Sequence, residues 1–231
     1  MRTKSQTPNP KLQISNLKSQ ISNPKSRITH HALRITHYDI YLVGVGGQGV
    51  LTIGDLIAEA ALRNGIPVSF YPTKGMAQRG GAVKARVRLG REGAGPNIPE
   101  KGADLVIAME VSEALKAVRF VKPGGDFVLF GHVWPPTAVM LGKAPYPTLD
   151  QVLEQVRGAG ASVHYLDPER LPLHDGAPVP ANVYVLGVAV GHTGLGQLLP
   201  PGQLAAVMQA KWARGAERND RAFEAGLKAE G

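Results

Sequence analysis

A glycine-rich hexapeptide, Gly44-Val45-Gly46-Gly47-Gln48-Gly49, has the residue types and the spacing to hold an anion. Three of its glycines stand in a G-x-G-x-x-G pattern, and Gly47 adds a fourth. Glycines allow a tight turn with accessible backbone N–H groups, and the positive end of a following helix attracts phosphate or carboxylate groups. The same glycines also suit close packing of a strand against a helix, or contact with a partner subunit, so these alternatives stay open.

Binding of a dinucleotide at this turn would require an acidic residue about 20 residues further on, to hold the ribose hydroxyls. No Asp or Glu occurs between Glu59 and Glu92. Lys74, after the second expected strand, would suit a 2′-phosphate, which keeps a phosphorylated dinucleotide open. The sequence therefore disfavours NAD and leaves close packing, a phosphate group or a partner subunit as explanations of the turn.

A second glycine-rich segment, Lys74-Gly75-Met76-Ala77-Gln78-Arg79-Gly80-Gly81, is predicted to be a loop between two strands. The strand that follows it alternates between basic and apolar residues, with Lys84, Arg86 and Arg88 on one face. This pattern is typical of a solvated edge strand whose charges oppose aggregation. The alternative is a surface for phosphates or for an acidic partner, with the guanidinium of Arg79 as a positive contact in the loop.

Strands that alternate with helices must position these two segments. Strands are predicted at 38–43, 67–71, 82–89, 103–109, 126–130 and 162–166, with a turn at Lys122–Gly125. Helices are predicted after Gly49 with Gly65 as the C-terminal glycine, near Glu110 and Ser112 with Ala114, Leu115 and Val118 facing inward, after a capping box at Thr148–Gln151, after Asn182, and at 203–213 and 219–228. We expect an α/β domain with a single doubly wound, mainly parallel sheet and a Rossmann-like strand–glycine turn–helix start. Ligands of such sheets lie at the carboxyl ends of the strands, where both glycine segments and Glu110 fall.

Two polar residues outside the glycine segments stand at expected helix starts. Glu110 ends a buried strand, and we interpret it as a helix cap rather than a catalytic acid because no base accompanies it. Ser112 is a second candidate for the same cap, and Asn182 is predicted to cap an apolar helix from 183 to 190. No Ser-His-Asp order, paired carboxylates or metal-ligand spacing stands out, so no catalytic residue and no metal ligand is assigned.

Composition excludes several classes of function. The 231 residues carry a net charge of +8, but residues 1–37 hold seven Lys or Arg and no acid. This leaves 19 basic and 18 acidic residues in 38–231, which argues against a nucleic-acid-binding domain. The absence of cysteine excludes disulfides, a thiol nucleophile and a cysteine-held iron–sulfur cluster on this chain. Without a membrane-length apolar run or a signal-peptide core, we expect a cytoplasmic protein with no membrane partner.

Residues 1–37 are predicted to form a disordered basic tail that precedes a domain at 38–231. The tail is rich in Ser, Asn, Lys and Pro and contains loose repeats, such as Gln13–Asn16 with Gln20–Asn23. Three origins compete: a basic arm for an acidic partner, an uncleaved targeting peptide, or an upstream stretch translated from a misplaced start. The repeats favour the misplaced start.

The two glycine segments, taken in this order, resemble the gamma-type domain of the 2-oxoacid:ferredoxin oxidoreductases. The resemblance extends over residues 38–231 through Gly102-Ala103-Asp104, Pro123-Gly124-Gly125, Asn182 with Leu186-Gly187, and Asn219–Gly226. The Met-Ala-Gln-Arg-Gly-Gly form of the second segment is most similar to the beta subunit of the indolepyruvate ferredoxin oxidoreductases. This chain departs from the family at Lys74, where a His often precedes the Gly-Met pair.

The resemblance implies oxidative decarboxylation of a 2-oxo acid to an acyl-CoA, with reduction of ferredoxin. It also implies that thiamine diphosphate and 4Fe-4S clusters lie on a catalytic partner subunit, that coenzyme A is a co-substrate, and that this subunit is not active alone. On this basis the candidate cofactor-contacting residues are Gly44, Gly46, Gly47, Gln48, Gly49, Lys74, Gly75, Met76, Gln78, Arg79, Gly80, Gly81, Glu110 and Asn182.

Two other classes of function remain as alternatives. A stand-alone NAD(P)-binding Rossmann-type oxidoreductase would bind a nicotinamide nucleotide as a single purified chain. A basic nucleic-acid-associated module would bind through the tail and would lose its salt-sensitive binding when the tail is deleted. The resemblance predicts instead a partner with CxxC-type cluster motifs and a thiamine site.

Overall fold

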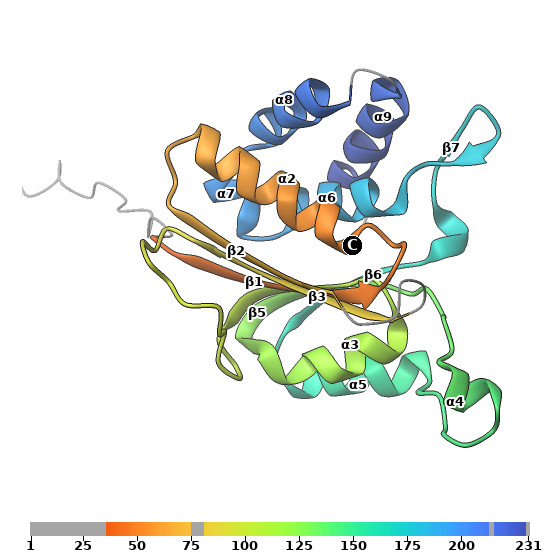
Figure 1. Cartoon of the computed structure of the whole chain (residues 1–231). Coiled ribbons are helices and arrows are strands. Elements are labelled where there is room, and N and C mark those ends of the chain that lie inside the picture. The colour runs from red at the N-terminus through yellow and green to blue at the C-terminus, as the bar shows by residue number, and fades with distance from the viewer. Residues whose placement is uncertain (1–35, 75–80, 213–214, 230–231) are drawn as a thin grey trace, which may run out of the picture. The chain divides into compact units, whose positions relative to one another are not determined.

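The computed structural model describes residues 36–74, 81–212 and 215–229. Its middle layer is a six-stranded sheet with the order β2-β3-β1-β4-β5-β6 (Figure 1). The strands are β1 (Tyr38–Val45), β2 (Val68–Lys74), β3 (Ala82–Leu89), β4 (Ala103–Ala108), β5 (Val121–Phe130) and β6 (Ser162–Leu166). A separate short ribbon pairs β7 (Leu173–His174) with β8 (Ala177–Pro178).

The sheet is mainly parallel, as predicted. Strands β1, β4, β5 and β6 pair in parallel, whereas β3 pairs antiparallel with both β1 and β2. Of the two interpretations of residues 82–89, the solvated edge strand is therefore wrong, because β3 lies between two strands. Its apolar residues Ala85, Val87 and Leu89 are fully buried, so the predicted alternation of faces is confirmed. The alternation defines two faces but does not say how many neighbours the strand has.

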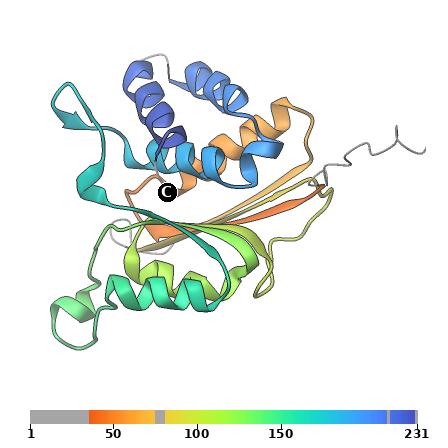
Figure 2. The ribbon, with the colours of Figure 1, turned by 180° about the vertical axis from the view of Figure 1, so that it is seen from behind.

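Helices cover both faces of the sheet, so the doubly wound class is confirmed (Figures 1 and 2). One face carries α2 (Val50–Arg63), α6 (Ala181–His192), α7 (Leu195–Leu198), α8 (Pro201–Lys211) and α9 (Ala216–Leu227). The other face carries α3 (Val111–Ala117) and α5 (Leu149–Gly158), with the short 3-10 helix η1 (Val118–Phe120) after α3. The connections contain α4 (Thr137–Met140) and the 3-10 helix η2 (Pro168–Arg170). No helix among the described residues is long and apolar enough to cross a membrane.

The core consists of two apolar clusters, one on each face of the sheet. Side chains of β1 alternate between them, with Ile40 and Leu42 under α2 and α6, and Tyr41 and Val43 under α3 and α5. Within the first cluster α6 and α9 approach closely at Gly226, where a Cβ atom would lie 2.1 Å from the carbonyl oxygen of Tyr184. Such contacts hold the larger helical layer together.

The predicted helix ends are confirmed at α2 and at the start of α3, and the predicted cap of α6 is wrong. Gly65, with φ +68, ends α2, and the N–H of Ile66 donates to the Ala61 carbonyl at 2.9 Å, which confirms the predicted C-terminal glycine. Glu110 caps α3, as predicted, and Ser112 does not. Pro180 precedes α6, so Asn182 lies inside the first turn rather than at the cap. Pro180 offers no side-chain cap, and its carbonyl accepts the first hydrogen bonds of the helix, from the Val183 and Tyr184 N–H groups at 3.2 and 3.0 Å.

Candidate functional site at the carboxyl edge of the sheet

The first glycine segment links β1 to α2 at the carboxyl edge of the sheet. Gly49 precedes α2 in a left-handed conformation with φ +75, and Gly47 has φ +98 with open space beside its Cα. At Gly44, by contrast, a Cβ atom would lie within 2.9 Å of Gln48, Val50 and Met109. Glycine is thus required for close packing at Gly44 and for backbone conformation at Gly47 and Gly49. The tip at Gly47 is the part of the turn that faces outward.

Gln48 fastens this turn to the neighbouring strand. Its side-chain oxygen accepts from the Val45 N–H at 2.9 Å, and its side-chain nitrogen donates to the Met109 carbonyl at 2.8 Å. Met109 lies directly after β4, which pairs with β1. Gln48 therefore holds the glycine turn in a defined position beside Glu110 rather than projecting into solvent.

Asn182 lies against the same turn, although its role differs from the predicted one. A Cβ atom at Gly49 would lie 2.5 Å from the side-chain nitrogen of Asn182, so the amide rests on the glycine backbone. The structure thus brings together Gly49 and Asn182, which are 133 positions apart in the sequence. This contact joins the N-terminal ends of α2 and α6 at one edge of the sheet.

The second glycine segment meets the first through its last residue. The N–H of Gly46 donates to the carbonyl of Gly81 at 3.0 Å. Lys74 is the last residue of β2, whereas Gly75, Met76, Gln78, Arg79 and Gly80 lie outside the described residues. Because β2 ends and β3 begins at this edge, the described ends of the second segment lie at the same edge of the sheet as the first, and Gly81 contacts it directly.

Glu110 organises the other side of this edge. Its side chain is fully buried and accepts from the Glu113 N–H and from the Ser112 hydroxyl, both at 2.8 Å. It also accepts from the Trp134 N–H at 3.2 Å and from the Tyr146 hydroxyl. Glu110 therefore caps α3 and, in addition, ties down the excursion between β5 and α5. The sequence carries no signal for this second role, because Trp134 and Tyr146 are 24 and 36 positions away.

An open groove of about 640 Å³ lies beside Glu110, at the carboxyl ends of β5 and β6. His132, Tyr146 and Tyr165 contribute its aromatic lining, and Asp167 and Glu169 add two carboxylates. The carboxylates disfavour an anionic ligand in this groove. It thus differs in character from the glycine turns, and sequence analysis did not indicate it.

The pKa of the Tyr146 hydroxyl is raised above its ordinary value of 10.0, by burial first and then by the hydrogen bond and charge of Glu110. Burial likewise raises the pKa of Tyr38. Because these groups ionise later in the folded chain, their stabilising effect is complete below about pH 10 and is lost as the pH rises toward the folded pKa. We expect the melting temperature to fall above about pH 10, and to fall less steeply in Tyr146→Phe. Parallel pH profiles of wild type and variant would contradict this assignment.

The carboxyl edge of this sheet lacks the strand arrangement with which a Rossmann unit binds a dinucleotide. In a Rossmann unit the second strand pairs in parallel beside the first and carries the acidic ribose contact at its end. Here the antiparallel strand β3 separates β2 from β1, and Thr73 and Lys74 end β2. Among the described residues, no group of three or more His, Asp or Glu comes together in a way that could hold a metal ion.

The doubly wound sheet and the paired glycine segments define an α/β domain with its candidate site at the carboxyl edge. Residues 39–229 match the family described as pyruvate ferredoxin/flavodoxin oxidoreductase. The chain belongs to the pyruvate ferredoxin/flavodoxin oxidoreductase family, and the resemblance seen in the sequence is confirmed. A nicotinamide-dependent enzyme and a nucleic-acid module are not favoured by this match.

The curated relatives of this chain include proteins named indolepyruvate oxidoreductase subunit IorB. The protein from Archaeoglobus fulgidus is 40% identical over 154 residues, which cover 67% of this chain and 76% of the relative. The protein from Thermococcus kodakarensis is 38% identical over 194 residues, which cover 83% of this chain and 95% of the relative. The similarity therefore extends over most of both relatives.

Solved structures share the fold at lower sequence identity. The pyruvate oxidoreductase subunit PORC of Thermotoga maritima has a TM-score of 0.60 at 21% identity and covers 83% of this chain and 96% of its own. The 2-oxoglutarate:ferredoxin oxidoreductase of Magnetococcus marinus has a TM-score of 0.53 at 20% identity, over 84% of this chain and 32% of its own. In the second protein the same fold is thus one part of a much longer chain.

Proposed function

We propose that this chain is the non-cluster subunit of a cytoplasmic, thiamine-dependent 2-oxoacid:ferredoxin oxidoreductase, with indolepyruvate or another arylpyruvate as substrate. The complex would convert the 2-oxo acid to an acyl-CoA and reduce ferredoxin. Family membership and the two IorB relatives support this proposal. The observation that carries it is the hydrogen bond from the Gly46 N–H to the Gly81 carbonyl, because it supports a common site for the two family motifs.

The donor atoms of this chain determine which cofactors it can hold. The chain has no cysteine, and its described residues form no cluster of metal ligands, so they do not fit an iron–sulfur cluster. Thiamine diphosphate and the 4Fe-4S clusters therefore belong to the catalytic partner in this proposal. The role left to this chain is to shape a pocket with backbone N–H groups and cations, next to the partner's thiamine or to coenzyme A.

Co-expression with a catalytic subunit that carries a thiamine site and CxxC-type cluster motifs tests the proposal. The complex should oxidise indolepyruvate in the presence of coenzyme A and reduce ferredoxin, whereas the isolated chain should do neither. A 2-oxo acid turned over by the isolated chain would refute the proposal, as would a complex that never forms. Substitution of pyruvate or 2-oxoglutarate for indolepyruvate separates the substrate assignment from the assignment of the complex.

Arg79→Ala should lower turnover of the complex, or the affinity between its subunits, about tenfold or more. A guanidinium makes paired hydrogen bonds to phosphate or carboxylate, and loss of such a contact costs about 1.5–3 kcal/mol. Arg63→Ala is the matched control, because Arg63 ends α2 at the opposite edge and pairs with Glu59 on its own helix. Wild-type turnover and assembly in Arg79→Ala would refute the role of Arg79.

A further inference from the structure

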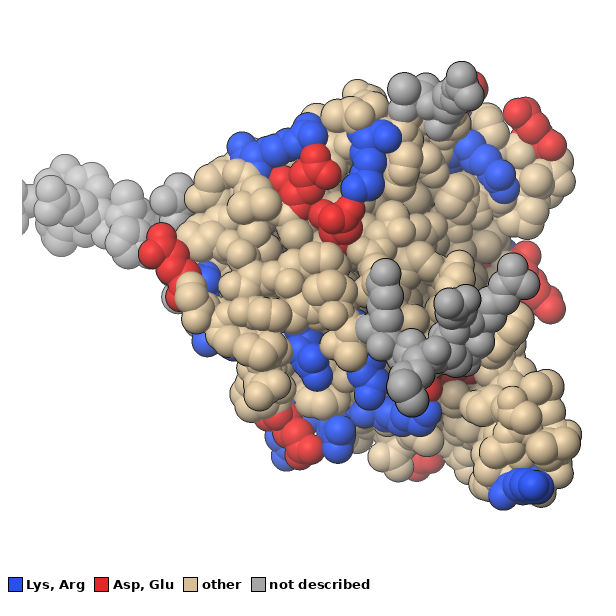
Figure 3. Space-filling view, in the orientation of Figure 1, with Lys and Arg blue, Asp and Glu red and all other residues tan. Residues whose placement is uncertain are grey.

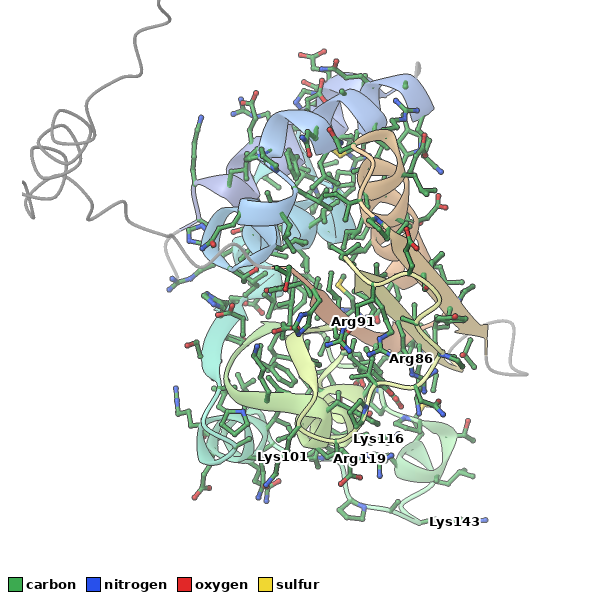
Figure 4. The ribbon with its side chains drawn as sticks, turned by 90° about the vertical axis from the view of Figure 1, so that its left-hand side faces the viewer. Arg86, Arg91, Lys101, Lys116, Arg119 and Lys143 are labelled. Atoms are coloured by element: carbon green, nitrogen blue, oxygen red, sulfur yellow. The ribbon has the colours of Figure 1, made fainter. Side chains whose placement is uncertain are left out.

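A second surface, on the side of the sheet that carries α3, has a concentration of positive charge. Six basic side chains on β3, α3, η1 and the connecting loops lie on one side of the sheet (Figure 4). We call this set the basic surface, and its members are Arg86, Arg91, Lys101, Lys116, Arg119 and Lys143. The space-filling view shows Lys and Arg along the lower part of the molecule with a few acidic side chains among them, and another group of Lys and Arg at the top (Figure 3). Since residues 38–231 carry a net charge of only +1, this density is local rather than general.

Two of these cations are held by an aromatic stack. The guanidinium carbon of Arg86 lies 5.6 Å from the ring centroid of Tyr41, and that of Arg119 lies 4.8 Å from the ring centroid of Phe120. The rings of Tyr41 and Phe120 stack on each other at 4.2 Å. Cation–π contacts of this kind orient the guanidinium groups. A partner would therefore lose less side-chain entropy on binding them than on binding free lysines.

The neighbouring carboxylates neutralise only part of this charge. Lys116 pairs with Glu113 at 2.6 Å and Arg119 with Glu100 at 3.6 Å, while Arg91 lies 4.0 Å from the Asp39 carboxylate that Arg88 already holds. In the described part of the chain, Arg86, Lys101 and Lys143 have no carboxylate within 4.0 Å, and the Nε atom of Arg86 is buried without a hydrogen-bond partner. The buried Nε atom of Arg86 is out of reach of a partner, so the exposed side chains of Lys101 and Lys143 supply the positive charge that is free for an external acceptor.

We propose that the basic surface docks an acidic patch of the catalytic partner subunit, an inference that rests on the proposed function. Its cations come from separate elements, so they match an extended set of carboxylates better than a single phosphate. A free anion is further disfavoured at the nearest cavity, about 450 Å³ between Lys101 and Arg119, because Glu154 also lines it. Complementary charge of this kind steers assembly and fixes the orientation of two subunits.

Charge reversal with a matched control tests the proposal. Arg119→Glu/Lys101→Glu should weaken binding of the purified catalytic subunit about tenfold or more at low salt, as measured by calorimetry, because like charges now face each other. The difference should shrink at about 0.5 M salt, where charges are screened over a few ångströms. Arg221→Glu/Lys228→Glu makes the same change in charge on α9 and at its C-cap residue, across the sheet from α3, and should bind like wild type.

Both substituted side chains are exposed, with 63% of the Arg119 side chain accessible, so the melting temperature should change little. The milder Arg119→Gln should give an intermediate loss of affinity. If wild type binds the partner and the double reversal binds equally tightly at low salt, the docking proposal is overturned and the proposed function stands. If wild type itself does not bind the partner, both fail. Loss of affinity for a DNA duplex alone, with partner affinity unchanged, would also overturn the docking proposal.

Discussion

Replacement of Arg88 by alanine should lower the free energy of unfolding by about 3–5 kcal/mol, because it leaves the Asp39 carboxylate buried without its counter-charge. Arg88 and Asp39 are only 8% and 3% exposed. The guanidinium makes paired hydrogen bonds to the carboxylate, at 2.8 and 2.9 Å, across the antiparallel strands β1 and β3. The same hydrogen bonds raise the pKa of Arg88 above its ordinary value.

Arg88 also fixes the loop that follows β3. One of its terminal nitrogens donates to the carbonyls of Gly95 and Asn97, both at 3.1 Å. Equilibrium denaturation of Arg88→Ala and of the control Arg91→Ala gives the comparison. Arg91 lies on the same loop, but it is 42% exposed and 4.0 Å from Asp39, so its loss should cost no more than about 0.5 kcal/mol. Equal destabilisation of the two variants would show that the buried Arg88–Asp39 pair contributes no more to the free energy of unfolding than the exposed Arg91.

Glu110→Ala should also cost about 3–5 kcal/mol, since it removes a helix cap and leaves several buried donors without an acceptor. The fully buried carboxylate accepts four hydrogen bonds, among them those from the Trp134 N–H and the Tyr146 hydroxyl. Its removal should free the segment between β5 and α5 from the carboxyl edge. The Trp134 amide should therefore exchange with solvent deuterium much faster than in wild type.

Two further variants separate the roles of Glu110. Glu110→Gln keeps the shape and one acceptor oxygen, so its destabilisation should be smaller than that of the alanine variant. Glu169→Ala removes an exposed carboxylate from the rim of the nearby groove and should change stability by no more than about 0.5 kcal/mol. Protection of the Trp134 amide that survives in Glu110→Ala would mean that other contacts hold the segment.

Local pattern predicted much of the architecture. The branched strand at Tyr38–Val45, the glycine turn, the helix closed by Gly65 and the capping box at Thr148 all appear where expected. Each of these features depends on residues close together in sequence, so periodicity and capping chemistry suffice to place them. The expected turn at Lys122–Gly125 is instead part of β5, where the pairing with β4 shifts register. Pairing with a neighbouring strand overrode the local preference for a turn.

The candidate site was predicted only in part, because some of its residues are close together in the sequence and others are far apart. Both glycine segments were expected at the carboxyl edge, and the structure places the described ends of each there, joined between Gly46 and Gly81. The groove beside Tyr146 and the second role of Glu110 were not expected, since their residues come from separate loops. Leu115 was predicted to face inward, yet it is 38% exposed, because α3 buries Val111, Ala114 and Ala117 instead.

The sequence by itself determined the absence of thiolate chemistry, the strand–turn–helix start and the family, because these depend on composition and on short motifs. Only the tertiary structure decided that β3 is an inner strand, that Arg88 is buried against Asp39, and that Arg86 and Arg119 share one aromatic stack. The order of strands in a sheet and the packing of distant side chains set these contacts. A local pattern identifies the face on which a residue lies, whereas its partner depends on how the whole chain folds back on itself.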